Sequence, residues 1–175
     1  MKVLLFGGAG YIGTHVALAF LERGDEVGIY DNLSTGLESN VSPKAKFYLG
    51  DILDREHVRE VLSEGWDVAV HLAAFKAAGE SMVKPEKYSE NNITGSLILI
   101  TECLKAGCRN FILSSSAATY GEPQYLPIDE KHPTNPENYY GYTKLCIEEN
   151  LAWYSKLKGL NYAALRYFNA AGYDV

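Results

Sequence analysis

The chain begins MKVLLFGGAGYIGTHVALAF, residues 1–20, and this stretch decides the fold. Residues 2–6 form a short apolar run of the length of a strand, and residues 11–23 have the length and composition of a helix. Between the two lie Gly7, Gly10 and Gly13, spaced by three. The stretch therefore predicts a strand, a tight glycine turn and a helix in succession.

This spacing of glycines is typical of a nucleotide-binding turn. One glycine lets the chain reverse, a second lets the backbone approach a pyrophosphate, and a third lets the helix pack closely on the strand. The start of the helix offers free N–H groups and positive potential to phosphates. A plain structural turn is the alternative, but a strand before and a helix after favour a dinucleotide site.

The same alternation of strand and helix continues along the chain. Helices are often followed by a glycine where a left-handed cap favours one, at Gly24, Gly65, Gly107 and Gly159. Strands joined by helical crossovers predict an α/β, doubly wound parallel sheet (Rossmann fold) in one domain, residues 1–175. We expect strands at residues 2–6, 27–30, 46–49, 68–72, 111–114 and 162–166, and helices at 11–23, 54–64, 85–105 and 141–158.

Composition excludes several other classes of protein. Sixteen basic against twenty-two acidic residues give a net charge of −6, which disfavours nucleic acid and anionic membrane surfaces as partners. The longest strongly apolar runs, residues 3–6 and 97–100, are far too short to cross a bilayer. The three cysteines and four histidines show no ligand spacing or disulfide framework, so we expect no metal and a reducing, cytoplasmic location.

Acidic residues follow the second and third strands. Asp31, with Asn32 after it, stands where a carboxylate binds the ribose diol, and no basic residue follows before Lys44. This arrangement favours NAD over NADP, although a turn residue is the alternative. Asp51 could accept from an adenine amino group with Ile52 packed on the ring, and a helix cap is nearly as good an interpretation.

Tyr140 and Lys144 are four residues apart and share one face of the last helix. A nearby ammonium and the positive helix end favour a phenolate, so Tyr140 could take a proton from a hydroxyl. Tyr154 and Lys158 have the same spacing but lie at the far end of the helix, where a surface pair is expected. Tyr139 and Tyr142 lack such a lysine and are expected to pack or to face substrate.

Hydroxyls and prolines precede this helix. Ser114, Ser115 and Ser116 follow the fifth strand, and we expect Ser116 to bond a reacting oxygen, with an ordinary loop as the alternative. Four prolines between residues 123 and 136 predict a long ordered loop at the carboxyl edge of the sheet. His71, which ends the fourth strand, is expected to be a hydrogen-bonded structural residue.

At this point the chain resembles the extended short-chain dehydrogenase/reductase family, and within it the sugar-nucleotide 4-epimerases. The matching motifs cover nearly the whole chain: GGAGYIGTH (7–15), DNLSTG (31–36), GDI (50–52), HLAAFKAAGES (71–81), NNITG (91–95), SSSAATYG (114–121), YGYTK (140–144) and LRYFNAAG (165–172). The resemblance implies bound NAD, transient oxidation of a UDP-hexose at C4, and interconversion of UDP-glucose and UDP-galactose. It implies a homodimer through residues 85–105 and 141–158.

The resemblance also assigns roles to residues. Ser116, Tyr140 and Lys144 would be catalytic, and Ser116, Tyr140 and Asn169 would contact the substrate. The cofactor would contact Gly7, Gly10, Tyr11, Ile12, Gly13, Asp31, Asn32, Ser34, Gly36, Asp51, Ile52, Leu72, Ala73, Ala74, Lys76, Asn92, Ser114, Tyr140, Lys144 and Tyr167.

Three alternatives stay open at this point. A 4,6-dehydratase would carry an acidic pair where this chain has Ala117 and Ala118, which disfavours dehydration. Another sugar-nucleotide epimerase and a non-catalytic NAD-binding module are the others. Members of the family continue into a smaller substrate domain, most of which this sequence lacks, so we expect impaired turnover.

Overall fold

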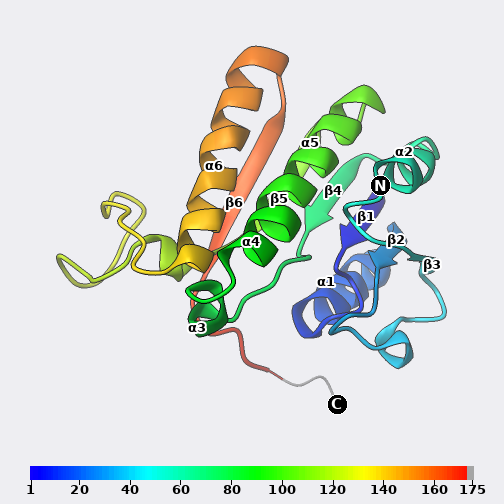
Figure 1. Cartoon of the computed structure of the whole chain (residues 1–175). Helices are drawn as coiled ribbons and strands as arrows, with labels where there is room; N and C mark the ends of the chain where they lie inside the picture. Colours follow the sequence, from blue (N-terminus) through cyan, green and yellow to red (C-terminus); the bar gives the residue numbers. More distant parts are fainter. Residues whose placement is uncertain (173–175) are drawn as a thin grey trace.

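The computed structural model describes residues 1–172. Its helices and strands follow the predicted alternation, with three short helical turns added (Figure 1). The strands are β1 (Lys2–Phe6), β2 (Glu26–Asp31), β3 (Lys46–Leu49), β4 (Val68–His71), β5 (Asn110–Ser116) and β6 (Asn161–Tyr167). The α-helices are α1 (Tyr11–Glu22), α2 (Arg55–Leu62), α3 (Ala78–Ser81), α4 (Pro85–Tyr88), α5 (Gly95–Lys105) and α6 (Tyr139–Lys158). Single turns occur at Glu38–Asn40, Ser89–Thr94 and Ala117–Thr119.

The six strands form one sheet in the order β3-β2-β1-β4-β5-β6, and every neighbouring pair is parallel. The predicted doubly wound sheet is confirmed. The order reverses between β1 and β4, which is where such sheets open a crevice at the carboxyl ends of their strands. Figure 1 shows these ends pointing to the same side of the molecule, toward the C-terminus.

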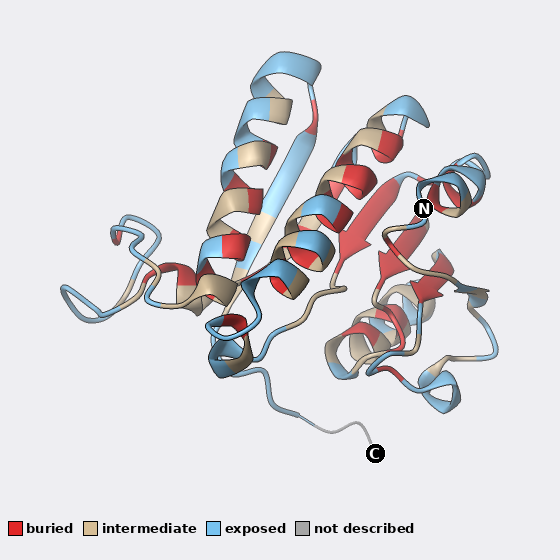
Figure 2. Cartoon of the chain, viewed as in Figure 1, coloured by how far each residue is buried: buried red, intermediate tan, exposed pale blue. Residues whose placement is uncertain are grey.

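Two apolar clusters hold helices to the two faces of the sheet. On one face Leu4, Phe6 and Leu113 pack with residues of α2, α5 and α6, including Ile147. On the other face Leu5 packs against α1. Strands that are apolar on both faces are expected in a parallel sheet covered on two sides. Figure 2 shows the contrast with β6, an edge strand that is largely exposed.

Glycines end four helical segments in the predicted way. Gly24, Gly65, Gly107 and Gly159 all have positive φ, between 68° and 86°. At Gly159 the residue is the left-handed cap of α6. A side chain would be strained at these positions, so the sequence marks the helix ends correctly.

The helical stretch expected over residues 85–105 is confirmed, but it is not a regular α-helix throughout. It consists of α4, a π-helical turn at Ser89–Thr94, and α5, without a break. Asn92 lies in the π turn, and its side chain is fully buried and bonds outside the helix. The short helix α3 was not predicted, and β5 extends two residues further than expected, to Ser116.

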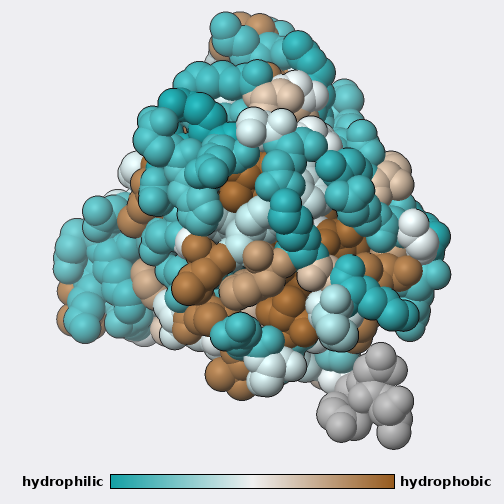
Figure 3. Space-filling model, turned by 90° about the vertical axis from the view of Figure 1, so that its right-hand side faces the viewer, coloured by the Kyte–Doolittle hydropathy of each residue, from teal (hydrophilic) through white to brown (hydrophobic). Residues whose placement is uncertain are grey.

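Figure 3 views the molecule from the side of β3. Apolar surface residues gather in the lower part of this view, toward the carboxyl ends of the strands (Figures 1 and 3). Within residues 1–172 no helix combines the length and apolar character needed to span a bilayer. The same described residues contain no cluster of metal-binding side chains.

Candidate active site

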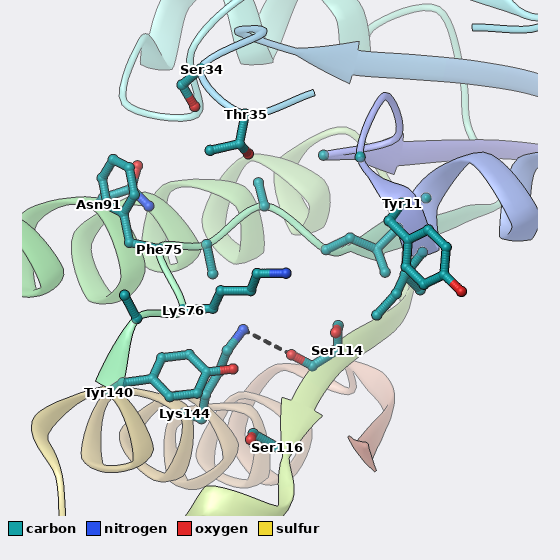
Figure 4. A pocket seen from close by; sticks show the side chains of 18 of the residues that line it. Tyr11, Ser34, Thr35, Phe75, Lys76, Asn91, Ser114, Ser116, Tyr140 and Lys144 are labelled. Carbon is teal, nitrogen blue, oxygen red and sulfur yellow. Dashed lines mark hydrogen bonds between the residues drawn. The ribbon is translucent and has the colours of Figure 1, made fainter. Parts of the chain in front are cut away.

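A cavity of about 890 Å³ opens at the carboxyl edge of the sheet (Figure 4). Its walls come from the carboxyl ends of all six strands, or from the residues directly after them, with α1, α6 and the loop after β4. Most of the residues predicted for a cofactor or substrate line it: Gly7, Gly10, Tyr11, Ile12, Gly13, Asp31, Asn32, Ser34, Ile52, Leu72, Ala73, Ala74, Lys76, Ser114, Ser116, Tyr140, Lys144, Tyr167 and Asn169.

Close packing explains two of the three loop glycines. Gly7 has φ +83°, and a Cβ there would lie 2.5 Å from the backbone nitrogen of Ala73. A Cβ on Gly13 would lie 2.5 Å from the carbonyl oxygen of Gly7. These two glycines are required by the fold of the chain itself.

Gly10 is different, because the chain leaves room beside it. A Cβ there would meet only the Gly7 carbonyl oxygen, at 3.6 Å, and its φ of −80° suits any residue. Gly10 also lines the cavity and is the N-cap of α1 without a side-chain capping bond. The first turn of α1 contains no acidic residue. Free N–H groups, positive potential and open space therefore suit an anion such as a diphosphate.

Asp31 ties the glycine loop to the end of β2. Its carboxylate oxygens accept from the backbone N–H of Ala9 at 3.0 Å and of Leu33 at 2.8 Å. Leu33, which donates the second of these bonds, has a positive φ of 57°. Asp31 is 8% exposed and lines the cavity, so its remaining lone pairs face the position expected for a ribose.

Three predicted residues do not line the cavity. Asp51 accepts from the Asn32 side chain at 2.9 Å and from the backbone N–H of Leu53 at 2.9 Å. Gly36 packs on Ala9, whose carbonyl carbon a Cβ would approach to 2.9 Å. Asn92 does not line the cavity but bonds to the main chain of Phe75, which does. Their positions make them supports of the cavity in this structure.

The predicted catalytic side chains line the same cavity. Tyr140 and Lys144 project from the first turns of α6, and Ser116 is the last residue of β5 (Figure 4). Lys144 Nζ donates to the carbonyl oxygen of Ser114 at 2.8 Å and lies 6.0 Å from the centre of the Tyr140 ring. The Ser116 hydroxyl caps the following turn by accepting from the backbone N–H of Ala118 at 3.1 Å.

Burial controls the charge state of this group. Lys144 is 2% exposed, and burial lowers its pKa to about 8, although the Glu148 carboxylate acts in the opposite direction. Burial raises the pKa of Tyr140, and the Ser116 hydroxyl opposes this rise. We expected Lys144 and the helix end to lower the pKa of Tyr140. The pKa rises instead, because loss of solvation outweighs the hydrogen bond from Ser116.

Helix α6 starts where Ser81 and Asn138 bind it. The Ser81 hydroxyl accepts from the backbone N–H of Tyr140 at 3.0 Å, and the Asn138 side chain accepts from that of Gly141 at 2.8 Å. Satisfying these N–H groups fixes the first turn, and with it the direction of the Tyr140 side chain. The unpredicted helix α3 supplies Ser81.

His71 is a structural residue, as predicted. It is fully buried, and its Nε2 lies 2.8 Å from Ser96 Oγ. Since the Ser96 hydroxyl donates to the Asn92 carbonyl, His71 Nε2 carries the proton and Nδ1 does not. Burial and the nearby Lys144 lower the pKa of His71 to about 3, so the ring is neutral.

The three other tyrosines of α6 do not line the cavity. Tyr154 is partly buried against the core and Lys158 is exposed, so the two lie outside the site, as expected, but only Lys158 is a surface residue. Tyr139 bonds Ser89 at 2.6 Å, and Tyr142 is exposed and tilted against the Tyr139 ring. These two pack together rather than face the cavity.

Sequence reasoning missed part of the wall. Glu80 and Lys87 form an ion pair with N–O distances of 3.0 Å, and Lys87 lies 4.0 Å from the centre of the Phe75 ring. Their spacing carries no recognisable signal, because α3, α4 and the loop after β4 meet only in the fold. Phe168, which the resemblance places with Tyr167 near the nicotinamide, also lines the wall. The wall residues without a predicted site role are Tyr30, Thr35, Gly50, Phe75, Ala77, Glu80, Lys87, Tyr88, Asn91, Ser115 and Ala170.

Fold and site together define an α/β protein of the Rossmann type with a Ser-Tyr-Lys group in the cavity at the carboxyl edge of its sheet. The chain belongs to the NAD dependent epimerase/dehydratase family, whose model matches residues 3–174. It is 48% identical to a UDP-glucose 4-epimerase of Lactobacillus helveticus over 173 residues, which are 98% of this chain and 52% of that protein.

Solved structures agree with this assignment. The UDP-glucose 4-epimerase of Brucella ovis in complex with NAD superposes with a TM-score of 0.96 at 45% identity, over 99% of this chain and 53% of that one. The UDP-glucose 4-epimerase of Bifidobacterium longum in complex with NAD+ and UDP gives 0.91 at 36% identity, over 97% and 53%. The chain thus spans about half the length of the relatives it matches.

Proposed function

We propose that this chain, as one domain, binds NAD and supplies the hydride-transfer site of a sugar-nucleotide 4-epimerase, an isomerase that interconverts UDP-glucose and UDP-galactose. One observation carries the proposal: the glycine loop and the Ser116, Tyr140 and Lys144 group line one and the same cavity. A dinucleotide is long enough to connect a phosphate site with a reacting centre.

The cavity suits NAD in particular. The loop around Gly10 and the start of α1 would hold the diphosphate, and Asp31 would hold a ribose. A carboxylate at Asp31 repels a 2′-phosphate, which supports NAD over NADP. Lys76 and Tyr167, which also line the cavity, would complete the cofactor site, with Asn169 toward the sugar nucleotide.

The chemistry assigned to the chain is proton transfer and positioning. Tyr140 would remove the proton from the C4 hydroxyl of the hexose and return it after the sugar has turned over. Ser116 would hold the same oxygen by a hydrogen bond. Lys144, fixed by the Ser114 carbonyl, would bind a cofactor ribose and stabilise negative charge on Tyr140. Bound NAD supplies the hydride acceptor and donor.

The wider setting belongs to the same proposal. Relatives whose structures contain UDP-glucose or UDP support a UDP-hexose as substrate. We include a homodimer through α5 and α6, which lie side by side (Figure 1), and a reducing, cytoplasmic location consistent with three free cysteines.

The test measures NAD binding and conversion of UDP-galactose to UDP-glucose by the purified chain, with the variants Tyr140→Phe and Tyr154→Phe. We expect NAD binding in all three proteins. Conversion lost only in Tyr140→Phe would support the assignment of the proton-transfer residue. NAD binding without conversion by the unaltered chain would favour a cofactor-binding module, and absence of NAD binding would refute the proposal.

A further inference from the structure

A buried carboxylate lies directly behind the proposed reacting group. Glu148 follows Lys144 by one turn of α6, and both side chains face the sheet. Glu148 is only 9% exposed, and the sequence assigned no role to it. A buried carboxylate is costly unless it is fully hydrogen-bonded, so its partners indicate what it does.

Glu148 bonds to two neighbouring strands at the same level of the sheet. Its Oε1 accepts from the Ser115 hydroxyl at 2.5 Å. Arg166 binds it in a bidentate manner, with Nε to Oε1 at 3.0 Å and Nη2 to Oε2 at 2.6 Å. Ser115 of β5 and Arg166 of β6 are paired in the sheet register. One carboxylate therefore joins α6, β5 and β6.

Each of these partners adjoins proposed site residues. Ser115 lies between Ser114, whose carbonyl binds Lys144, and Ser116. Arg166 immediately precedes Tyr167 and Phe168, which line the cavity. A shift of Glu148 would move the ends of both β5 and β6. Displacing reacting groups by about 1 Å lowers the rate of a reaction strongly.

The Arg166 side chain also connects Glu148 to the aromatic residues Tyr120 and Phe168. Its guanidinium lies 4.7 Å from the centre of the Tyr120 ring, and Tyr120 stacks on Phe168 with centroids 6.5 Å apart. Tyr120 is buried, whereas Phe168 is 63% exposed at the cavity. Arg166 thus supports the exposed Phe168 side chain through the Tyr120 ring that lies between them.

We propose that Glu148, clamped by Ser115 and Arg166, is a positioning residue that fixes the ends of β5 and β6 around Lys144 and keeps that lysine cationic. Lys144 is faced by neutral His71 of β4 and by Tyr140 of its own helix, and the Arg166 charge on β6 is engaged by Glu148. The Glu148 carboxylate opposes the effect of burial on the pKa of Lys144. The role of Lys144 rests on the proposed function.

The decisive experiment is an NMR titration of lysine-labelled chain without nucleotide, for Glu148→Gln and for Glu149→Gln. Glu149 is the adjacent, exposed carboxylate, so its replacement removes the same charge without touching the clamp. We expect the pKa of Lys144 to fall below about 8 in Glu148→Gln and to stay unchanged in Glu149→Gln. Equal values in both variants would overturn the proposal.

Two further variants separate positioning from general stability. Glu148→Asp keeps the charge but is shorter by a methylene, so we expect a lower unfolding temperature with the Lys144 titration largely retained. Should Glu148→Gln not fold, Arg166→Gln leaves the carboxylate unpaired, and the pKa of Lys144 should rise. An unchanged pKa in Arg166→Gln would contradict the proposal.

NAD titration of the same preparations distinguishes this inference from the proposed function. We expect NAD affinity to fall several-fold in Glu148→Gln and to be retained in Glu149→Gln. If the unaltered chain does not bind NAD, the proposed function fails, while the nucleotide-free Lys144 titration still tests the clamp. If NAD binds equally to both variants, the positioning role is refuted.

Discussion

The side-chain amide of Asn92 bonds both main-chain groups of Phe75. Its Oδ1 accepts from the Phe75 N–H at 3.0 Å, and its Nδ2 donates to the Phe75 carbonyl at 2.9 Å and to Thr143 at 3.2 Å. The π turn of residues 89–94 brings this amide to the loop after β4. A buried asparagine thereby joins that wall of the cavity to helix α6.

Replacing Asn92 tests this connection. In Asn92→Ala the Phe75 main chain loses both partners in a buried place, and we expect the free energy of unfolding to fall by about 2 to 3 kcal/mol. NAD affinity should fall as well, because Phe75 and Lys76 line the cavity. Chemical denaturation and NAD titration measure the two effects. Asn161→Ala, at an exposed position, is the control; equal losses in the two variants would contradict this role.

Gly10 and Gly13 should respond differently to alanine. A Cβ on Gly10 would lie 3.6 Å from the Gly7 carbonyl oxygen, its nearest neighbour. Gly10→Ala should therefore change the free energy of unfolding by less than about 1 kcal/mol. NAD affinity should nevertheless fall at least about tenfold, because the methyl group occupies the place of the diphosphate. Undiminished NAD affinity in a folded Gly10→Ala would show that the diphosphate lies elsewhere.

Gly13→Ala provides the opposite case. Its Cβ would lie 2.5 Å from the Gly7 carbonyl oxygen and 2.6 Å from the Gly8 Cα, both backbone atoms. We expect destabilisation of about 1 to 3 kcal/mol, measured by urea unfolding without nucleotide. A Gly13→Ala protein as stable as the unaltered chain would mean that the loop and α1 can separate freely.

His71 should make stability depend on pH. Its pKa of about 3 in the folded chain lies below the usual value near 6.5, so the unfolded chain binds the extra proton between these limits. Stability is therefore retained above about pH 6.5 and lost on acidification, by at most about 1.4 kcal/mol per pH unit from this residue. Unfolding curves of the chain and of His71→Gln should converge as the pH falls. His15→Gln is the control, and a constant difference between His71→Gln and the chain would exclude this contribution.

Glu102 should be the main acid-sensitive carboxylate of the core. Its side chain is fully buried and accepts from Lys105, Arg59 and Arg55. Burial raises its pKa, but these three hydrogen bonds outweigh burial and lower the pKa to about 2. The stabilisation is present above the ordinary pKa and is lost as the pH falls toward 2.

In Glu102→Gln we expect a loss of about 1 to 3 kcal/mol at neutral pH, since the three cations keep partial access to solvent. Urea unfolding at several pH values measures this loss. Glu56→Gln removes a largely exposed partner of Arg59 and should cost little. A larger loss in Glu56→Gln than in Glu102→Gln would contradict the assignment.

The helices and strands of this protein, and their order along the chain, follow from local sequence patterns. Apolar runs such as residues 2–6 form strands, and glycines such as Gly7 and Gly159 require backbone conformations that other residues avoid. Tyr140 and Lys144 share a helix face because four residues span one turn. These features depend on local geometry, so the local sequence contains them.

The tertiary structure alone decided the supports of the site and its charge states. The helix predicted over residues 85–105 contains a π turn in which the Asn92 amide binds the distant main chain at Phe75. Glu148 meets Arg166 only when β6 pairs with β5. The pKa of Tyr140 rises where the sequence predicted a fall, because burial is set by everything packed around the side chain. Desolvation of a side chain and its contacts with distant segments depend on everything that the fold packs around it, so no local pattern encodes them.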